Sequence, residues 1–145
     1  MSYGYVAELK ENNAKAVGLA LPISRKESMM VCEALRGMNV QKAKAYLEDV
    51  MALKKPVAYT RYNMDVGHKR GMAAGRFPVS ACKHILGIVK NAEANAQFKG
   101  LSTGNLIIKS AVAQKGPKAY HFGRERTTAK RAHVEIVLEE GKKQK

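Results

Sequence analysis

The sequence predicts an α+β fold in which three helices pack on a small antiparallel sheet and a long basic β-hairpin protrudes. Three stretches in the middle of the chain repeat apolar residues at intervals of three and four, as helices with one buried face do. Two later segments are rich in Ile and Val, which favours strands. At 145 residues the chain, 1–145, fits a single domain that can bury a core.

Before the first helix we expect a short strand over residues 3–9 and irregular chain over residues 10–21. The first helix begins at Ser24. Ser24 and Glu27 have the spacing of a capping box, in which the serine side chain accepts a hydrogen bond from the Glu27 amide. Gly37 ends this helix, because glycine readily adopts the left-handed conformation that follows a helix.

The second and third helices are bounded by similar signals. Asn39 can cap the second helix, and Pro56 closes it. Pro78 suits the first turn of the third helix, which is the longest, and Gly100 follows its end. Near that end, Ala96 lies on the apolar face, where a small side chain allows a neighbouring element to approach closely.

Two segments lack a steady apolar period and are predicted to be appendages of the body. Residues 57–75 form a basic insertion loop between the second and third helices. Strands over 106–114 and 133–139 pair antiparallel in an extended hairpin, 106–139. Its tip, 115–132, has few apolar residues and cannot form a core of its own. A partner that surrounds the tip would therefore be its natural stabiliser.

Positive charge is concentrated in these two appendages. Lys54–Arg76 contains six Lys/Arg against one acid, and Lys109–Ala132 contains seven against one. Their net charges of +5 and +6 make up 11 of the formal +14 of the chain. Such a field attracts a polyanion, and nucleic acid is the commonest one. The structural alternative is a pair of solvated charged segments without a ligand.

The basic segments also contain aromatic and amide side chains. Arg and Lys neutralise phosphates, and aromatic rings stack on unpaired bases, which is the usual mode of RNA recognition. Arg25 and Lys26 stand in the first turn of the first helix and oppose its dipole, which either an anion nearby or plain solvation would explain. The candidate RNA-binding residues are Arg25, Lys26, Arg61, Tyr62, Asn63, His68, Lys69, Arg70, Arg76, Lys115, Lys118, Tyr120, His121, Arg124, Arg126, Lys130 and Arg131.

Other classes of function find little support. The chain lacks the phosphate-binding loop, dinucleotide and nucleophile-elbow motifs, and its four histidines are scattered, so we expect no enzyme activity and no catalytic residues. Cys32 and Cys82 are far apart with no metal-ligand spacing, so we expect no metal and no cofactor, but two buried thiols in a reducing cytosol. No apolar run is long enough to span a membrane, and no secretory signal is present, so a membrane partner is not expected.

Several stretches carry a resemblance to a known family. They are ISRKESMMVCEALRGMNVQKAKAYLEDV, RYN, VGHKRG, GRFPVSACKHILGIVKNAEANAQFKGL, KGPK and HVEIVLEE. Together they resemble the universal large-subunit ribosomal protein family numbered twenty-two, called seventeen in eukaryotes. The similarity is strongest over Val89–Leu101 and covers almost the whole chain. The insertion 57–75 resembles that of archaeal and eukaryotic members.

The resemblance implies a structural protein seated on large-subunit ribosomal RNA near the exit of the peptide tunnel. Its hairpin would line the tunnel wall beside the nascent polypeptide, with neighbouring ribosomal proteins around it. Such a protein assists subunit assembly and resides in the cytoplasm, in the large subunit. By position, Arg124, Arg126, Lys130 and Arg131 would line the hairpin tip, and Arg61, Tyr62, Asn63, Lys69, Arg70 and Arg76 would hold RNA at its base.

The alternative to a ribosomal role is a stand-alone, sequence-tolerant nucleic-acid binding protein or RNA chaperone. The basic segments fit this alternative as well, because phosphate contacts carry no sequence information. An RNA-modifying enzyme comes third, since no candidate catalytic set is present.

Overall fold

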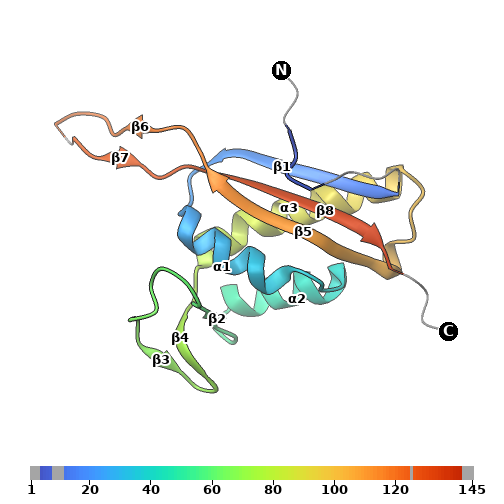
Figure 1. Ribbon diagram of the computed structural model, residues 1–145, viewed down its shortest axis with the longest axis horizontal. Helices are drawn as coiled ribbons and strands as arrows, with labels where there is room; N and C mark the ends of the chain where they lie inside the picture. Colours follow the sequence, from blue (N-terminus) through green and yellow to red (C-terminus); the bar gives the residue numbers. More distant parts are fainter. Residues whose placement is uncertain (1–3, 8–11, 125, 142–145) are drawn as a thin grey trace.

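The structure of the protein is a computed structural model that describes residues 4–7, 12–124 and 126–141. A three-stranded sheet and three helices form the body, and a basic arm extends from one end of it (Figure 1). The elements within the described residues are β1 (Asn13–Leu21), α1 (Arg25–Leu35), α2 (Val40–Met51), β2 (Val57–Ala58), β3 (His68–Lys69), β4 (Met72–Arg76), α3 (Val79–Phe98), the 3₁₀ turn η1 (Thr103–Asn105), β5 (Leu106–Lys115), β6 (Ala119–Tyr120), β7 (Thr128–Ala129) and β8 (Ala132–Glu140).

The main sheet has the order β1-β8-β5, and both pairings are antiparallel. The predicted pairing of the two C-terminal strands is confirmed, because Leu106 pairs with Glu140 at one end and Lys115 with Ala132 at the other. A bulge near Lys109 shifts the register in β5. The buried side of that strand therefore changes phase, which is why its apolar residues do not alternate strictly along the sequence.

Strand β1 corrects the prediction of irregular chain over residues 10–21. It pairs with β8 from Asn13 opposite Glu139 to Leu21 opposite Ala132. Its small residues have low strand propensity, but they suit a strand that lies directly under a helix. A Cβ on Gly18 would lie 2.7 Å from Cδ1 of Ile88 in α3, so glycine permits this close approach. Packing against α3 thus outweighs the local propensity.

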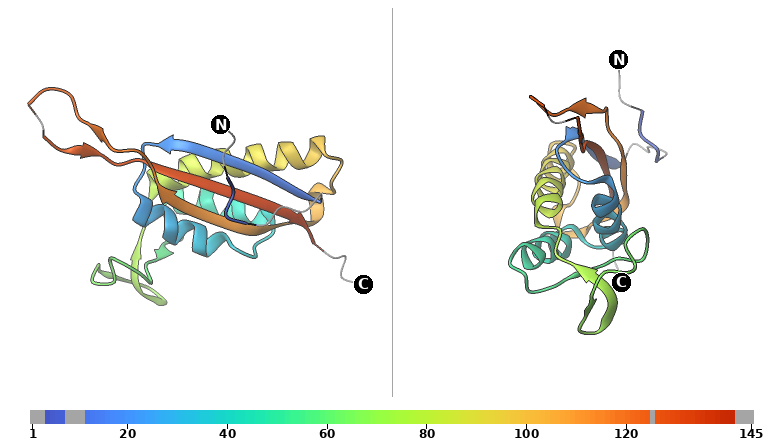
Figure 2. Two further views of the ribbon diagram at one scale, coloured as in Figure 1. Left: turned by 45° about the horizontal axis from the view of Figure 1, so that its top comes forward. Right: turned by 90° about the vertical axis from the view of Figure 1, so that its left-hand side faces the viewer.

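The helices cover one face of the sheet (Figure 2). Helix α3 packs on β1 and β8, α1 packs on β5, and α2 packs mainly on α3. Side chains from the helices also reach the two outer edges of the sheet: Asn95 Nδ2 donates to the Lys15 carbonyl oxygen at 2.8 Å, and Arg36 Nε donates to the Ala111 carbonyl oxygen at 3.0 Å. These two hydrogen bonds occupy backbone carbonyl oxygens of the edge strands, which would otherwise be open to pairing with a strand of a second chain.

Most helix-end signals are confirmed, although α2 ends at Met51, before Pro56, and Pro78 precedes the first turn of α3. Asn39 Oδ1 accepts from the Gln41 amide at 2.9 Å, as predicted for a cap. Gly37 and Gly100 adopt positive φ just after α1 and α3. Ser24 precedes α1, but its side chain makes no capping hydrogen bond, so the capping box is wrong; its carbonyl oxygen accepts from Ser28 instead.

The interface between α3 and its neighbours gives a first prediction. Ala96 is fully buried, so Ala96→Leu should overpack this face and lower the free energy of unfolding by ~1–3 kcal/mol. A matched change on the exposed side of the same helix is Gly87→Ala, whose added Cβ meets nothing within 4 Å. This variant should be more stable by roughly 0.5–1 kcal/mol, because alanine restricts the unfolded chain. Urea denaturation measures both changes, and an unchanged midpoint for Ala96→Leu would contradict the packing.

The insertion 57–75 is more ordered than the predicted loop. Its segments β2, β3 and β4 form a second small sheet in the order β2-β4-β3, which hangs below α1 and α2 in Figure 1. Tyr59 anchors it, since the ring is buried and its amide donates to the Ala74 carbonyl oxygen at 2.9 Å. Burial raises the pKa of Tyr59 to about 12. Strands β2 and β3 have two residues each and β4 is made mostly of small residues, so they leave almost no periodic signal in the sequence, which explains the error.

The predicted strand over residues 3–9 lies partly outside the described residues. Residues 4–7 are described and form no strand. They approach the sheet through Val6, whose amide donates to Oε1 of the buried Glu135 at 3.1 Å. No helix among the described residues is both long and apolar enough to cross a membrane.

The two thiols give a pH-dependent prediction. Cys32 and Cys82 are buried, and burial raises the pKa of each from 9.0 to about 12. The folded state therefore holds its thiol protons at a pH where the unfolded chain releases them. Stability that is complete below pH 9 should be lost at about 1.4 kcal/mol per pH unit for each thiol as the pH rises toward 12.

This loss is measured by urea denaturation at a series of pH values between 8 and 10.5. The control is the double variant Cys32→Ala and Cys82→Ala, which should be less stable at neutral pH but should lose stability more slowly above pH 9. An equal alkaline slope for the variant would show that the thiols are not the cause.

Candidate nucleic-acid interface

A basic groove lies where three separate parts of the chain converge. Its volume is about 530 Å³. The start of α1, the end of β4 and the root of the arm contribute its walls. The lining residues are Ser24, Arg25, Lys26, Glu27, Asn63, Arg76, Lys115, Gly116, Pro117, Lys118, Thr128, Ala129, Lys130 and Arg131. We call this set the basic groove.

The groove contains seven Lys or Arg residues and one carboxylate, Glu27. The ion pairs recorded among the described residues lie elsewhere and join Lys44 to Glu93, Lys55 to Asp49 and Lys109 to Glu139. Seven like charges around one hollow repel one another, and screening by water only partly relieves that repulsion. An anionic ligand would remove it, which makes a polyphosphate backbone the natural occupant.

The root of the arm is held by a close backbone contact at Gly116. Its amide donates to the Arg131 carbonyl oxygen at 2.9 Å. A Cβ at this position would lie 2.9 Å from the Arg131 carbonyl carbon, so only glycine fits without a backbone shift. The two walls that carry Lys115 and Arg131 are thereby fixed at a short separation.

Gly116→Ala should therefore spread the root of the arm and weaken RNA binding by up to roughly ten-fold, since phosphate contacts depend on position. The melting temperature should change little, because the arm lies outside the core. Gly104→Ala is the matched control, as its added Cβ meets nothing within 4 Å. Filter binding to ribosomal RNA measures the affinity, and equal affinities for the two variants would contradict a fixed root.

Tyr62 lies next to the groove and is one of the exposed large hydrophobic residues, with 43% of its surface accessible. Its ring centroid is 5.5 Å from Lys26 Nζ and 5.9 Å from the guanidinium carbons of Arg25 and Arg61. The contact explains how two cations in the first turn of α1 are tolerated against the helix dipole, because the face of an aromatic ring attracts cations.

Three of the predicted residues lie away from the groove. His68 and Lys69 form β3, and Arg70 lies in the turn between β3 and β4, so all three belong to the hairpin of the small second sheet. They are exposed, and Lys69 Nζ lies 5.7 Å from the centroid of the Phe77 ring. The structure places them on a separate basic surface of the insertion.

The outer part of the arm carries the remaining predicted residues. Strands β6 and β7 pair there, and the His121 amide donates to the Thr127 carbonyl oxygen at 3.1 Å. Tyr120 and Phe122 are 76% and 100% exposed. His121, Arg124 and Arg126 are exposed as well. Large exposed aromatic rings among cations are unusual on a protein surface and fit contact with RNA bases.

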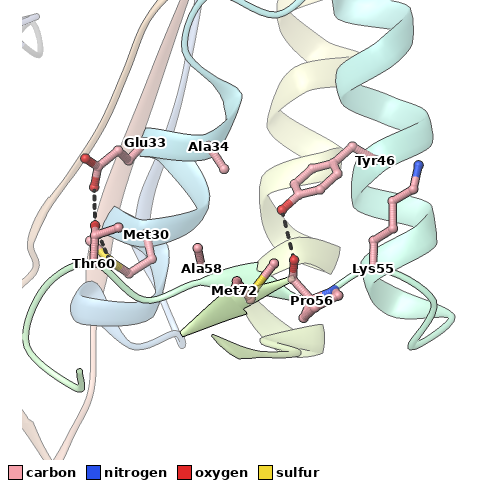
Figure 3. A pocket seen from close by; sticks show the side chains of 9 residues that line it. All are labelled: Met30, Glu33, Ala34, Tyr46, Lys55, Pro56, Ala58, Thr60 and Met72. Atoms are coloured by element: carbon pink, nitrogen blue, oxygen red, sulfur yellow. Dashed lines mark hydrogen bonds between the residues drawn. The ribbon is translucent and has the colours of Figure 1, made fainter. Parts of the chain in front are cut away.

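A second hollow, of about 380 Å³, lies between α1, α2 and the insertion. Its walls are mainly apolar, and its two charged residues, Glu33 and Lys55, lie on opposite sides of it (Figure 3). Such a separation offers no acid–base pair to a substrate. Among the described residues, no group of three or more His, Cys, Asp and Glu is placed to hold a metal ion.

The sequence predicts all seven cations of the groove as binding residues but not that they meet. The sequence predicts Lys54–Arg76 and Lys109–Ala132 as two separate basic sites, whereas Arg76, Lys130 and Arg131 line one hollow. The other lining residues are not among the predicted binding residues: Ser24, Glu27, Gly116, Pro117, Thr128 and Ala129. Gly116 and Pro117 belong to the KGPK stretch. A glycine and a proline at the end of a predicted strand can mark a close approach of two backbones, and this is the signal that could have indicated the root of the arm.

Comparison with known proteins shows which sequences this chain is similar to. A model of the family described as ribosomal protein L22p/L17e matches residues 16–139. The large ribosomal subunit protein uL22 of Archaeoglobus fulgidus is 41% identical over 119 residues, which cover 80% of this chain and 77% of the relative. The proteins of the same name from Methanocaldococcus jannaschii and Ignicoccus hospitalis are each 40% identical, over 90% and 96% of this chain and 89% and 98% of their own lengths. The chain belongs to the L22p/L17e family of ribosomal proteins.

Proposed function

We propose that the protein is a structural constituent of the large ribosomal subunit that binds large-subunit ribosomal RNA through the basic groove and the arm. The observation that carries this proposal is the convergence of seven cations from three parts of the chain on one hollow, in a member of a ribosomal protein family. Phosphates of a folded RNA can bridge these parts in a way that a single charged segment cannot. The family is not one of enzymes.

The arm has a different task from the groove in this proposal. It projects from the body (Figure 1), and its outer part carries exposed rings and cations. An arm of this kind can enter RNA and contact more than one RNA segment, so it would assist assembly of the subunit. We propose that it lines the wall of the peptide exit tunnel, beside the nascent polypeptide, and that the body lies near the tunnel exit against neighbouring ribosomal proteins in the cytoplasm.

A sedimentation experiment tests the ribosomal role. The tagged protein is expressed in cells, ribosomes are separated into subunits, and the large subunits are washed at high salt. We expect the protein to remain with the large subunit through the wash. Release of the protein into the soluble fraction, together with equal affinity for duplex DNA and single strands, would favour the stand-alone nucleic-acid binding protein instead.

A further inference from the structure

We propose that Tyr62 is a stacking platform for an unpaired RNA base, and that Arg25, Lys26 and Arg61 bind the phosphates on either side of that nucleotide. The inference rests on the proposed RNA binding and adds the chemical class of the ligand at this position. It concerns a single-stranded or bulged nucleotide rather than a helical segment.

The position of the ring suits a base. The ring lies within 6 Å of three cations, and its hydroxyl group donates to Met29 Sδ at 3.6 Å, which holds the ring at the side of α1. A nucleobase can stack on such a ring, and a guanidinium plane can cover its other side. The free protein already brings together the ring and the cations that this arrangement needs.

The backbone at Tyr62 supports a role for its side chain. The φ angle is +67°, in the left-handed region that favours glycine, and the Asn63 amide donates to the Arg61 carbonyl oxygen at 2.9 Å across it. A bulky residue in this conformation carries strain that glycine would avoid. The turn therefore lowers the stability of the fold, and it directs the ring toward Arg25 and Lys26.

The charges identify the ligand as a nucleotide rather than an apolar partner. Among the described residues, no ion pair joins Arg25, Lys26 or Arg61 to a carboxylate. These cations repel one another around one ring, and phosphates relieve that repulsion. Bases inside a duplex cannot reach a ring in this way because their faces are already stacked, so the ligand must present an unpaired base.

The absence of tryptophan from the sequence makes a direct test possible. Tyr62→Trp introduces a single reporter, which is titrated with a single-stranded adenosine oligomer and with an abasic oligomer of equal length and phosphate number. We expect the adenosine oligomer to quench the tryptophan fluorescence and to bind about ten-fold more tightly than the abasic oligomer. Equal affinities without quenching would overturn the stacking.

Two further variants separate stacking from structure. Tyr62→Phe keeps the ring and should retain the preference for the adenosine oligomer. Tyr62→Gly removes the ring and relieves the backbone, so it should stay folded with a urea midpoint close to that of the parent yet lose most of the preference for the adenosine oligomer, the remainder coming from the exposed rings of the arm. A preference in Tyr62→Gly as large as that of the parent would contradict the proposal. If the parent bound neither oligomer nor ribosomal RNA, the proposed function itself would fail, which is a different result from equal binding.

Discussion

The affinity of the isolated protein for large-subunit ribosomal RNA should fall by about 10³–10⁵ when the salt concentration rises from 50 to 200 mM. The reason is release of counterions. The groove and arm together can neutralise roughly 6–10 phosphates, and each contact contributes about 0.9 to the slope of log affinity against log salt. Filter binding or fluorescence anisotropy over this range gives the slope. A flat plot would exclude an electrostatic interface.

Two single variants that each remove one positive charge show which cations determine the slope of log affinity against log salt. Lys130→Ala removes a cation of the groove and should reduce the slope by about 0.9. Lys55→Ala also removes one cation, but Lys55 Nζ is paired with Asp49 Oδ2 at 2.9 Å, outside the groove. Its slope should equal that of the parent. Equal reductions in both variants would show that net charge, not the groove, governs binding.

Removal of the arm should separate RNA binding from folding. The variant lacks residues 116–131 and joins Lys115 to Ala132 through Asn-Gly, a two-residue turn that suits antiparallel strands. The junction is compatible with the sheet because Lys115 and Ala132 are already paired. The loss of five Lys and Arg residues should reduce the salt slope by up to about 4.5, with weaker binding at every salt concentration.

The body of this variant should remain folded, with a cooperative urea transition. Its remaining RNA contacts would come from Arg25, Lys26, Arg61 and Arg76 and from the cations of the small second sheet. An unfolded product would show that the arm belongs to the core. A folded product with unchanged RNA binding would show that the arm is not an RNA-binding element, although it contains some of the most basic sequence in the chain.

Elements with a strong apolar pattern could be predicted from the sequence, and elements without one could not. Helix α3 and strands β5 and β8 follow apolar patterns over nine or more residues, which distinguish helix from strand. Strand β1 was missed because its inward residues, Ala14 and Ala16, are small and its stability comes from α3 and β8. The second small sheet was missed because β2 and β3 have two residues each and β4, with five, contains mostly small residues, so none has a clear apolar period.

The composition of the candidate site could also be predicted, but its arrangement could not. An excess of Lys and Arg is visible in any stretch of sequence. Arg76, Lys115 and Lys130 line the same hollow only because α1 and β4 lie beside the root of the arm. That arrangement is a property of the tertiary fold. The contact of Tyr62 with Arg25 and Lys26 joins positions far apart in the sequence, so no local pattern could reveal it.

Electron cryomicroscopy of large ribosomal subunits that contain this protein tests the central claim most directly. The map shows what occupies the basic groove and what surrounds the arm. We predict density for ribosomal RNA in the groove, with phosphates within hydrogen-bond distance of Arg76, Lys130 and Arg131. A subunit in which the groove faces open solvent or another protein, with RNA bound to a different surface of the chain, would contradict the account.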